Sequence, residues 1–220
     1  MVHEVAQSSV AEPPTINRRV RRREQSRDLV YRAAVSLFIA QGFDETTMDQ
    51  IAERADVARA TVFNHFPRKT AFLDEWTARR RQQYMDAIHK KDVSGWSLDK
   101  TLNRYMVEVA EVCTRTRVET VALLSATLHQ TNVLSRPQLG NDIAELIRGV
   151  RRSGNAPQDI HAGHAGLMLA TSYFVILSQW IETDPPPFDL ESELLKMLRV
   201  VLYGVLAAPT DANPSQATKP

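Results

Sequence analysis

Side chains that could read the edges of nucleic-acid bases are concentrated in one short segment, residues 59–66. Arginine can pair bidentately with guanine and asparagine with adenine, and Arg59 and Asn64 stand in this segment. Val62 and Phe66, four residues apart, would hold the segment against a core as a helix. The remaining face, which would point outward, consists of Arg59, Ala60, Thr61, Phe63, Asn64 and His65. This pattern indicates a helix that presents polar groups to the major groove of a duplex.

The residues before this segment have the pattern of two further helices. Residues 23–41 repeat apolar positions at three- and four-residue spacing, which predicts a helix that Gly42 ends in the left-handed conformation. A second helix begins after Thr47, or after Thr46 before it, because threonine is a good N-cap. Residues 56–58 then separate it from the third helix. Two short helices separated by such a break predict a helix-turn-helix.

Positive charge near this motif supplies candidate phosphate contacts. The formal net charge is only +1, so the distribution of charge matters more than its sum. Residues 18–23 contain five arginines, each able to displace a counterion from a phosphate. The predicted contacts of this run are Arg21, Arg22 and Arg23. Thr47 and Lys69 stand at the starts of flanking helices, where backbone amides favour a phosphate, and they complete the predicted set.

Downstream of residue 70 the pattern is helical only, and no run of period two predicts a strand. The predicted helices cover residues 69–88, 97–113, 117–134, 141–151, 158–182 and 189–207. The fold class is therefore all-α, with an N-terminal three-helix helix-turn-helix domain and a larger C-terminal helical domain. The predicted divisions are a flexible arm over 1–20, the helix-turn-helix domain over 21–70, the helical domain over 71–208 and a disordered tail over 209–220.

The helices of the larger domain carry a group of residues suited to an internal ligand site. The candidate ligand-binding residues are Tyr105, Met106, Leu124, Leu128, Tyr173 and Trp180. Each by itself reads as ordinary core, but together they suit an apolar or amphipathic small molecule. No arginine falls within these apolar stripes, so a multiply anionic ligand is not expected. The cluster at residues 79–81 is interpreted as a solvated helix face.

Other kinds of chemistry find little support. Cys113 is the single cysteine, which excludes an internal disulfide and suits a reducing cytoplasm, and a buried apolar role is the simplest reading. His161 and His164 share a helical face, but no third ligand stands near them, so no metal site is expected. No cofactor or catalytic group is predicted, so an enzyme is not expected. The most apolar stretch, residues 162–181, is punctuated by polar residues and reads as a buried helix, not a membrane span.

Residues 27–76 resemble the tetracycline-repressor (TetR) family of bacterial transcriptional regulators. The resemblance is carried by Leu37-Phe38, Gly42-Phe43, Thr46-Thr47, Ile51-Ala52 and the run from Thr61 to Lys69. It implies a repressor that binds a pseudo-palindromic operator in double-stranded DNA and is released by a small-molecule effector. It also implies a ligand-binding and dimerisation domain over 71–208, with a homodimer formed through residues 158–182 and 189–207.

Three positions depart from the family pattern. Asp56 stands where the turn usually has glycine, but aspartate tolerates the left-handed conformation. Ala58 replaces a serine that would cap the third helix, at a cost of about 1 kcal/mol. Phe63 replaces a tyrosine and loses its hydroxyl, so it is suited equally to core packing and to a contact beside a phosphate. A second hypothesis stays open, in which the DNA-bound protein uses its helical domain to recruit a protein partner and binds no ligand.

Overall fold

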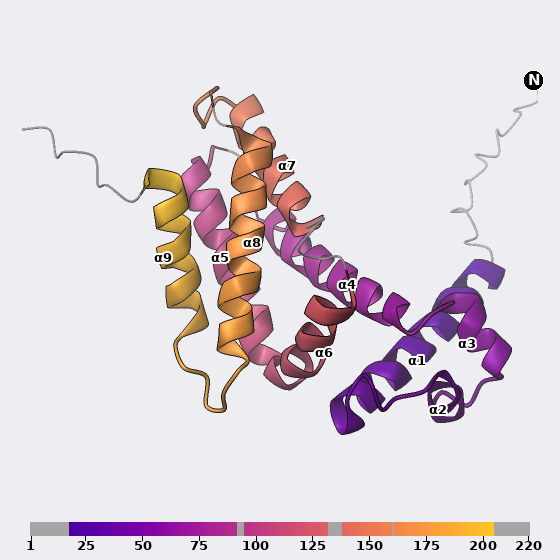
Figure 1. Ribbon diagram of the computed structural model, residues 1–220. Helices are drawn as coiled ribbons and strands as arrows, with labels where there is room; N and C mark the ends of the chain where they lie inside the picture. Colours follow the sequence, from indigo (N-terminus) through magenta and orange to yellow (C-terminus); the bar gives the residue numbers. More distant parts are fainter. Residues whose placement is uncertain (1–17, 92–94, 132–137, 160, 205–220) are drawn as a thin grey trace, which may run out of the picture.

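The computed structural model describes residues 18–91, 95–131, 138–159 and 161–204, and within them the secondary structure is helical (Figure 1). The helices are α1 Arg18–Gln41, α2 Met48–Arg54, α3 Arg59–His65, α4 Thr70–His89, α5 Leu98–Arg115, α6 Arg117–Gln130, α7 Gln138–Arg152, α8 Ala162–Trp180 and α9 Leu190–Tyr203. The predicted all-α fold is confirmed over these residues.

The helices form two groups joined by α4 (Figure 1). Helices α1, α2 and α3 pack together as a small head. Helices α5, α7, α8 and α9 form a larger bundle, in which α7 packs on α8 and α5 on α9. Helix α4 starts at the head and runs into the bundle, and α6 contacts both α1 and α4. The head and the bundle are therefore connected through α4 and α6.

Local signals end the helices of the head. Gly42 has φ of 90°, a conformation that glycine adopts without strain, so the chain leaves α1 at that residue as predicted. Thr47 caps α2 through a capping box, because its hydroxyl accepts from Gln50 N while Gln50 Oε1 accepts from Thr47 N. Asp56 adopts a positive φ of 51° in the turn, and Ala58 leaves α3 without a side-chain cap. These expectations are confirmed.

Aromatic rings form the core of the head. Phe38 from α1 lies 5.0 Å from the Phe43 ring and 5.9 Å from the Phe72 ring, measured between centroids. Phe66 stacks on Phe72 at 4.0 Å. Burial of such rings removes a large apolar area from water, so this cluster stabilises the head. It fixes α3 against α1 and α4 through its inward face.

The bundle depends on a close crossing of α7 and α8. Gly140 and Gly166 face each other, and a Cβ built on Gly166 would lie 2.2 Å from the carbonyl oxygen of Gly140. Only glycine permits this approach. Helix α8 buries Leu169, Tyr173 and Leu177 on one side and exposes apolar residues on the other. None of the helices described is both long enough and apolar enough to cross a membrane.

Several predicted boundaries differ from the structure. Residues 18–20 belong to α1 and not to a flexible arm, since arginine is a good helix former. Helix α7 begins at Gln138, earlier than the predicted residue 141, and α8 begins later than residue 158. The rest of the predicted arm and the whole predicted tail lie outside the described residues. The same holds for the last residues of the predicted helices 117–134 and 189–207.

Candidate nucleic-acid interface and ligand cavity

Helix α3 presents one face to the core and the other to solvent. Val62 and Phe66, which is four residues later, are fully buried. The outward residues Arg59, Ala60, Phe63 and Asn64 are exposed, whereas Thr61 and His65 are half-buried. The structure therefore brings most of the predicted reading face together on the surface of one short helix. Because α2 packs directly on α3, this pair has the arrangement of a helix-turn-helix.

Arg59 makes contacts on the surface of the head. Its Nε lies 3.0 Å from Asp49 Oδ1 of α2 in an ion pair, and its guanidinium lies 5.4 Å from the centroid of the Phe63 ring. Both partners of the ion pair are mostly exposed, so the pair contributes only about 0–1 kcal/mol. Such a weak pair can be exchanged for a contact to a base. Phe63 contacts Arg59 and is exposed, which favours a surface role over core packing.

His65 contacts α1 and does not simply point into solvent. Its Nε2 lies 3.2 Å from Ser26 Oγ, and its carbonyl oxygen accepts a hydrogen bond from Arg27 Nη1 at 2.8 Å. Burial lowers the pKa of His65, and the charges of Arg27 and Arg23 lower it further. The imidazole is therefore neutral at pH 7, and a contact with phosphate would be a hydrogen bond without a full charge.

Lys69 and Thr47, the two phosphate contacts predicted at the starts of helices, already make different interactions within the head. The Lys69 ammonium donates to the carbonyl oxygens of Phe43, Asp44 and Thr46 at 2.7, 3.0 and 3.0 Å. It thereby holds the loop between α1 and α2, a structural role that the sequence did not indicate. Thr47 is exposed at the start of α2, with its hydroxyl engaged in the capping box. Contact of either residue with phosphate stays a prediction.

The arginine run supplies exposed charge at the edge of the head. Arg21, Arg22 and Arg23 lie on the first turns of α1, and all three are exposed. A cation on a helix can reach a phosphate without unfolding the segment, so the predicted contacts are compatible with this position. They too stay predictions.

Ion pairs join the head to α4. Arg27 Nη2 donates to Glu75 Oε2 at 2.7 Å, and its guanidinium lies 4.3 Å from the Phe66 ring centroid. Arg79 donates to Asp28 Oδ1 at 2.6 Å and to Glu75 Oε1 at 2.8 Å. Burial would raise the pKa of Glu75, but hydrogen bonds from Arg27 and Arg79 lower it overall. The carboxylate is therefore ionised at neutral pH and bridges α1 to α4.

The interpretation of residues 79–81 as a solvated helix face was wrong. Arg79 pairs with carboxylates of α1 and α4, and Arg81 Nε donates to Asp142 Oδ2 of α7 at 2.6 Å. Arg80 is only 6% exposed. Consecutive residues of a helix point about 100° apart, so the three side chains reach three different neighbours. The charge of these residues predicted exposure to solvent, but α1, α6 and α7 cover this part of α4.

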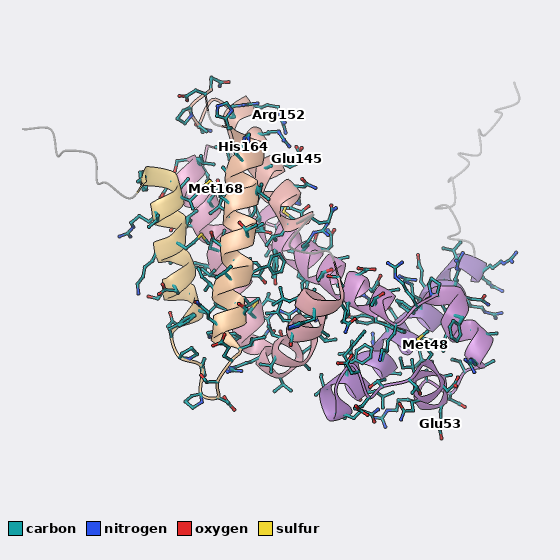
Figure 2. All side chains as sticks on the ribbon, viewed as in Figure 1. Met48, Glu53, Glu145, Arg152, His164 and Met168 are labelled. Carbon is teal, nitrogen blue, oxygen red and sulfur yellow. The ribbon has the colours of Figure 1, made fainter. Side chains whose placement is uncertain are left out.

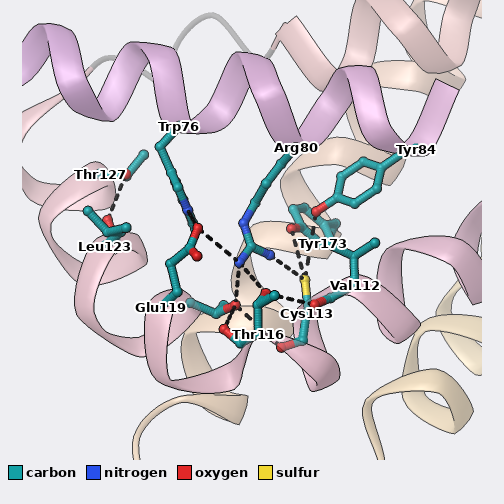
Figure 3. Close-up of polar contacts among 11 residues, drawn as sticks. Trp76, Arg80, Tyr84, Val112, Cys113, Thr116, Glu119, Leu123, Thr127 and Tyr173 are labelled. Carbon is teal, nitrogen blue, oxygen red and sulfur yellow. Dashed lines mark hydrogen bonds and ion pairs between the residues drawn. The ribbon is translucent and has the colours of Figure 1, made fainter. Parts of the chain in front are cut away.

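Arg80 enters a buried polar cluster between α4, α5, α6 and α8 (Figure 3). Its Nη2 donates to Thr116 Oγ1 at 2.6 Å and Thr120 Oγ1 at 2.8 Å, and its Nη1 lies 3.6 Å from Cys113 Sγ. The guanidinium also lies 4.5 Å from the Trp76 ring centroid. Trp76 Nε1 in turn donates to Glu119 Oε1 at 2.7 Å. A buried charge and its hydrogen bonds thus lie where the sequence predicted no arginine.

A cavity of about 190 Å³ lies beside this cluster. Its lining residues are Asp74, Trp76, Thr77, Arg80, Arg81, Tyr84, Leu124, Thr131, Gln138, Leu139, Tyr173 and Phe174. Of the predicted ligand-binding residues, Leu124 and Tyr173 line it. The other four do not: Tyr105, Met106 and Trp180 are buried core, and Leu128 packs against that core.

Half of the cavity wall comes from α4, and this half was missed. Trp76, Arg80 and Tyr84 recur every four residues, so they share one face of this helix. That spacing was a detectable signal in the sequence. The arginine within it also overturns the expectation that no arginine enters the ligand-facing stripes. Leu139 and Phe174 complete the wall from α7 and α8.

The sequence offered two groups for metal or nucleophilic chemistry, the histidine pair 161/164 and Cys113. The rings of His161 and His164 lie 5.9 Å apart at the start of α8, far from Met48 and the head (Figure 2). Among the described residues, no three histidine, cysteine or acidic side chains gather as metal ligands. Cys113 is fully buried, as predicted, and burial raises the pKa of its thiol although Arg80 lies near it.

Comparisons of sequence relate the head to known regulators. The family described as "Bacterial regulatory proteins, tetR family" matches residues 30–76. The regulator TcmR of Streptomyces glaucescens is 45% identical over 51 residues, which are 23% of this chain and 23% of TcmR. SrpR of Pseudomonas putida is 40% identical over 58 residues, or 26% of this chain and 27% of SrpR. The matched region thus spans about a quarter of each of these relatives.

A comparison of structures extends the similarity through the bundle. FadR of Thermus thermophilus, a TetR family transcriptional repressor, is 30% identical with a TM-score of 0.64. The similarity covers 85% of this chain and 98% of FadR. Both the head and the helical bundle therefore have counterparts in one relative. The chain belongs to the tetR family of bacterial regulatory proteins.

Proposed function

We propose that this protein is a sequence-specific transcriptional repressor that leaves its operator when a small amphipathic molecule binds its helical bundle. The observation that carries this proposal is the exposed outer face of α3, held on a helix-turn-helix in a chain of the tetR family. Arg59 and Asn64 supply base-reading groups, and the α1 arginines supply phosphate contacts. The protein would act in the cytoplasm, where the bacterial chromosome lies.

A homodimer through α8 and α9 would present two such heads to a pseudo-palindromic operator. Apolar side chains stand exposed on these helices: Leu167, Met168 (Figure 2) and Val175 on α8, and Val200 on α9. Met168 and Val175 lie seven residues apart, or two helical turns, and thus on one face. Exposed apolar residues aligned in this way support pairing with a second copy. The predicted interface over residues 158–182 and 189–207 includes them.

The cavity supports ligand binding as the function of the bundle. Half of its twelve lining residues are aromatic or aliphatic, and Arg80 is a buried polar group among the others, which suits an amphipathic molecule. The similar FadR of Thermus thermophilus is described in complex with lauroyl-CoA, which is itself amphipathic. The alternative, a bundle that only recruits a protein partner, requires no internal cavity, so the cavity favours the ligand-responsive function.

Helix α4 is suited to couple the two sites because it takes part in both. Trp76 and Arg80 line the cavity, while Glu75 and Arg79, adjacent in sequence, pair with α1. A shift of α4 on ligand binding would move the head and change the separation of two recognition helices. The ligand-bound and operator-bound conformations then compete, and a coupling of about 1–3 kcal/mol is sufficient for regulation.

The test begins with selection of bound fragments from random double-stranded DNA by the purified full chain. The expected result is a two-fold symmetric consensus bound by a dimer, with binding that persists in excess competitor DNA. Binding without sequence preference would refute the proposal. Compounds are then screened for release of the selected fragment, and a complete lack of release by amphipathic compounds would refute the ligand-responsive part alone.

A further inference from the structure

The charge of Arg80 is buried and only partly compensated. The residue is 6% exposed, and among the described residues no hydrogen-bond acceptor meets its buried Nε. The nearest carboxylate oxygen, Glu119 Oε1, lies 3.9 Å from Nη2 and already accepts from Trp76. Buried charges are normally paired at hydrogen-bond distance, because an unpaired one is costly. Arg80 therefore has capacity for a further acceptor.

The other groups around Arg80 do not supply negative charge. Thr116 and Thr120 offer neutral hydroxyls. Burial raises the pKa of Tyr84 and of Cys113, so both are protonated at neutral pH. By contrast, the neighbouring arginines on the same helix each have a carboxylate within 2.6 Å. The missing partner of Arg80 is thus a specific feature of this position.

The cavity gives access to Arg80 and limits what can reach it. Arg80 lines the cavity together with the apolar side chains of Trp76, Leu124, Leu139 and Phe174. Its volume of about 190 Å³ is comparable with the roughly 150 Å³ that accommodates a benzene-sized molecule. A single ring or a short alkyl chain fits this space. A long acyl chain with a nucleotide head is larger than this space.

We propose that the effector of this cavity is a small monocarboxylate with an apolar body, whose carboxylate binds the Arg80 guanidinium. This proposal rests on the proposed function of the bundle as a ligand sensor and names the chemical class of the ligand. A cationic ligand is disfavoured by Arg80 itself. Further anionic groups are disfavoured by Asp74 in the wall and by Asp142, which pairs with Arg81. The apolar body packs on Trp76, Leu124 and Phe174.

The test compares charged and neutral ligands of the same shape on the full-length protein. Isothermal titration calorimetry measures the Kd of phenylacetate and octanoate, and of phenylacetamide and octanamide as their neutral counterparts. Each carboxylate is expected to bind at least tenfold more tightly than its amide, because a hydrogen bond to a charged partner is the stronger one. Equal affinity, or tighter binding of the amides, would overturn the assignment of the carboxylate to Arg80.

Variants then locate the site. Arg80→Gln should remove most of the preference for the carboxylate, whereas Arg148→Gln removes an arginine of α7 that pairs with Glu145 outside the cavity and should keep it. If Arg80→Gln does not fold, the cavity-filling Leu124→Phe replaces it and should weaken both ligand types. An unchanged preference in folded Arg80→Gln, or unchanged affinity for both ligand types in Leu124→Phe, would place the ligand elsewhere and overturn the proposal.

Operator binding separates this proposal from the proposed function. In one outcome, the protein binds the selected DNA fragment and lauroyl-CoA releases it, whereas phenylacetate and octanoate neither bind the protein nor release the DNA. The monocarboxylate assignment is then wrong and the repressor function stands. If no DNA sequence is preferred but the carboxylates bind with dependence on Arg80, the repressor function is wrong and the site stands.

Discussion

The head and the bundle of this protein use buried space differently. In the head, short helices close around stacked phenylalanine rings, and charged groups lie at the surface or pair with carboxylates. In the bundle, long helices approach closely at glycines and enclose a polar cluster and a cavity. The stacked rings of the head hold its reading face in place, whereas the bundle combines a cavity with a partly satisfied cation. Five tests, each made by substitution, examine this contrast.

The largest effect is expected in the aromatic core of the head. Phe72→Ala removes a fully buried ring that contacts Phe38 and Phe66, and should lower the free energy of unfolding by about 3–5 kcal/mol. Chemical denaturation followed by circular dichroism measures the loss. Specific DNA binding should be lost in the same preparation. A variant with unchanged stability would show that the ring cluster does not hold the head.

The corresponding test in the bundle is the crossing of α7 and α8. Gly166→Ala places a Cβ against the Gly140 carbonyl and should cost about 1–3 kcal/mol of unfolding free energy through overpacking. The matched control is Gly163→Ala on the same helix, where nothing lies within 4 Å of the new Cβ. The control should gain about 0.5–1 kcal/mol, because alanine is the better helix former. Equal effects at both positions would contradict the close crossing.

On the reading face, Arg59 and Lys69 should behave differently. Arg59→Ala should relax base preference at particular operator positions, with a loss of about 1–3 kcal/mol in specific binding and little change in folding. Lys69→Ala should instead destabilise the head, since its ammonium holds three backbone carbonyls of the loop after α1. Operator variants scored by gel shift, together with thermal unfolding, distinguish the two. A position-specific loss of base preference for both would refute this division.

Helix capping in the head can be changed in both directions. Thr47→Ala removes the hydroxyl of the capping box of α2 and should cost about 1 kcal/mol of stability. Ala58→Ser adds a cap that α3 lacks and should gain about 0.5–1 kcal/mol. Denaturation midpoints measure both changes. A loss of stability in Ala58→Ser would mean that the added hydroxyl does not reach the amides of α3.

The smallest effect concerns pH. Burial, with Arg27 and Arg23 nearby, lowers the pKa of His65 in the folded state, so the unfolded chain binds the proton more readily. Stability associated with this residue is therefore complete above the unfolded value of about 6.5 and declines as pH falls below it. His65→Gln should reduce this decline in unfolding free energy measured between pH 7.5 and 5.5. An identical pH dependence in the variant would contradict a role for His65.

Much of the head and its reading face could be predicted because the signals act locally. Gly42, Thr47 and Asp56 determine turns and caps within a few residues of themselves, and Val62 determines which face of α3 is buried. The long helices of the bundle were also predictable in number and order from their apolar periodicity. Their ends were less so, since capping is weaker evidence than periodicity.

The cavity was predictable only in part. Leu124 and Tyr173 line it, but Tyr105, Met106 and Trp180 are core, because apolar character does not distinguish a residue beside a cavity from one that fills the interior. Burial of a charged side chain was also unexpected. Residues 79–81 have the composition of a surface, and only their neighbours decide otherwise.

By itself, the sequence determined where the helices of the head turn and which side chains of α3 face outward, because those outcomes depend on interactions within a few residues. The tertiary structure alone decided that Arg80 is enclosed by α4, α5, α6 and α8 and borders a cavity. The physical reason is that burial of a charge depends on groups distant in sequence, here Thr116, Thr120 and Tyr173, which come together only when the helices pack.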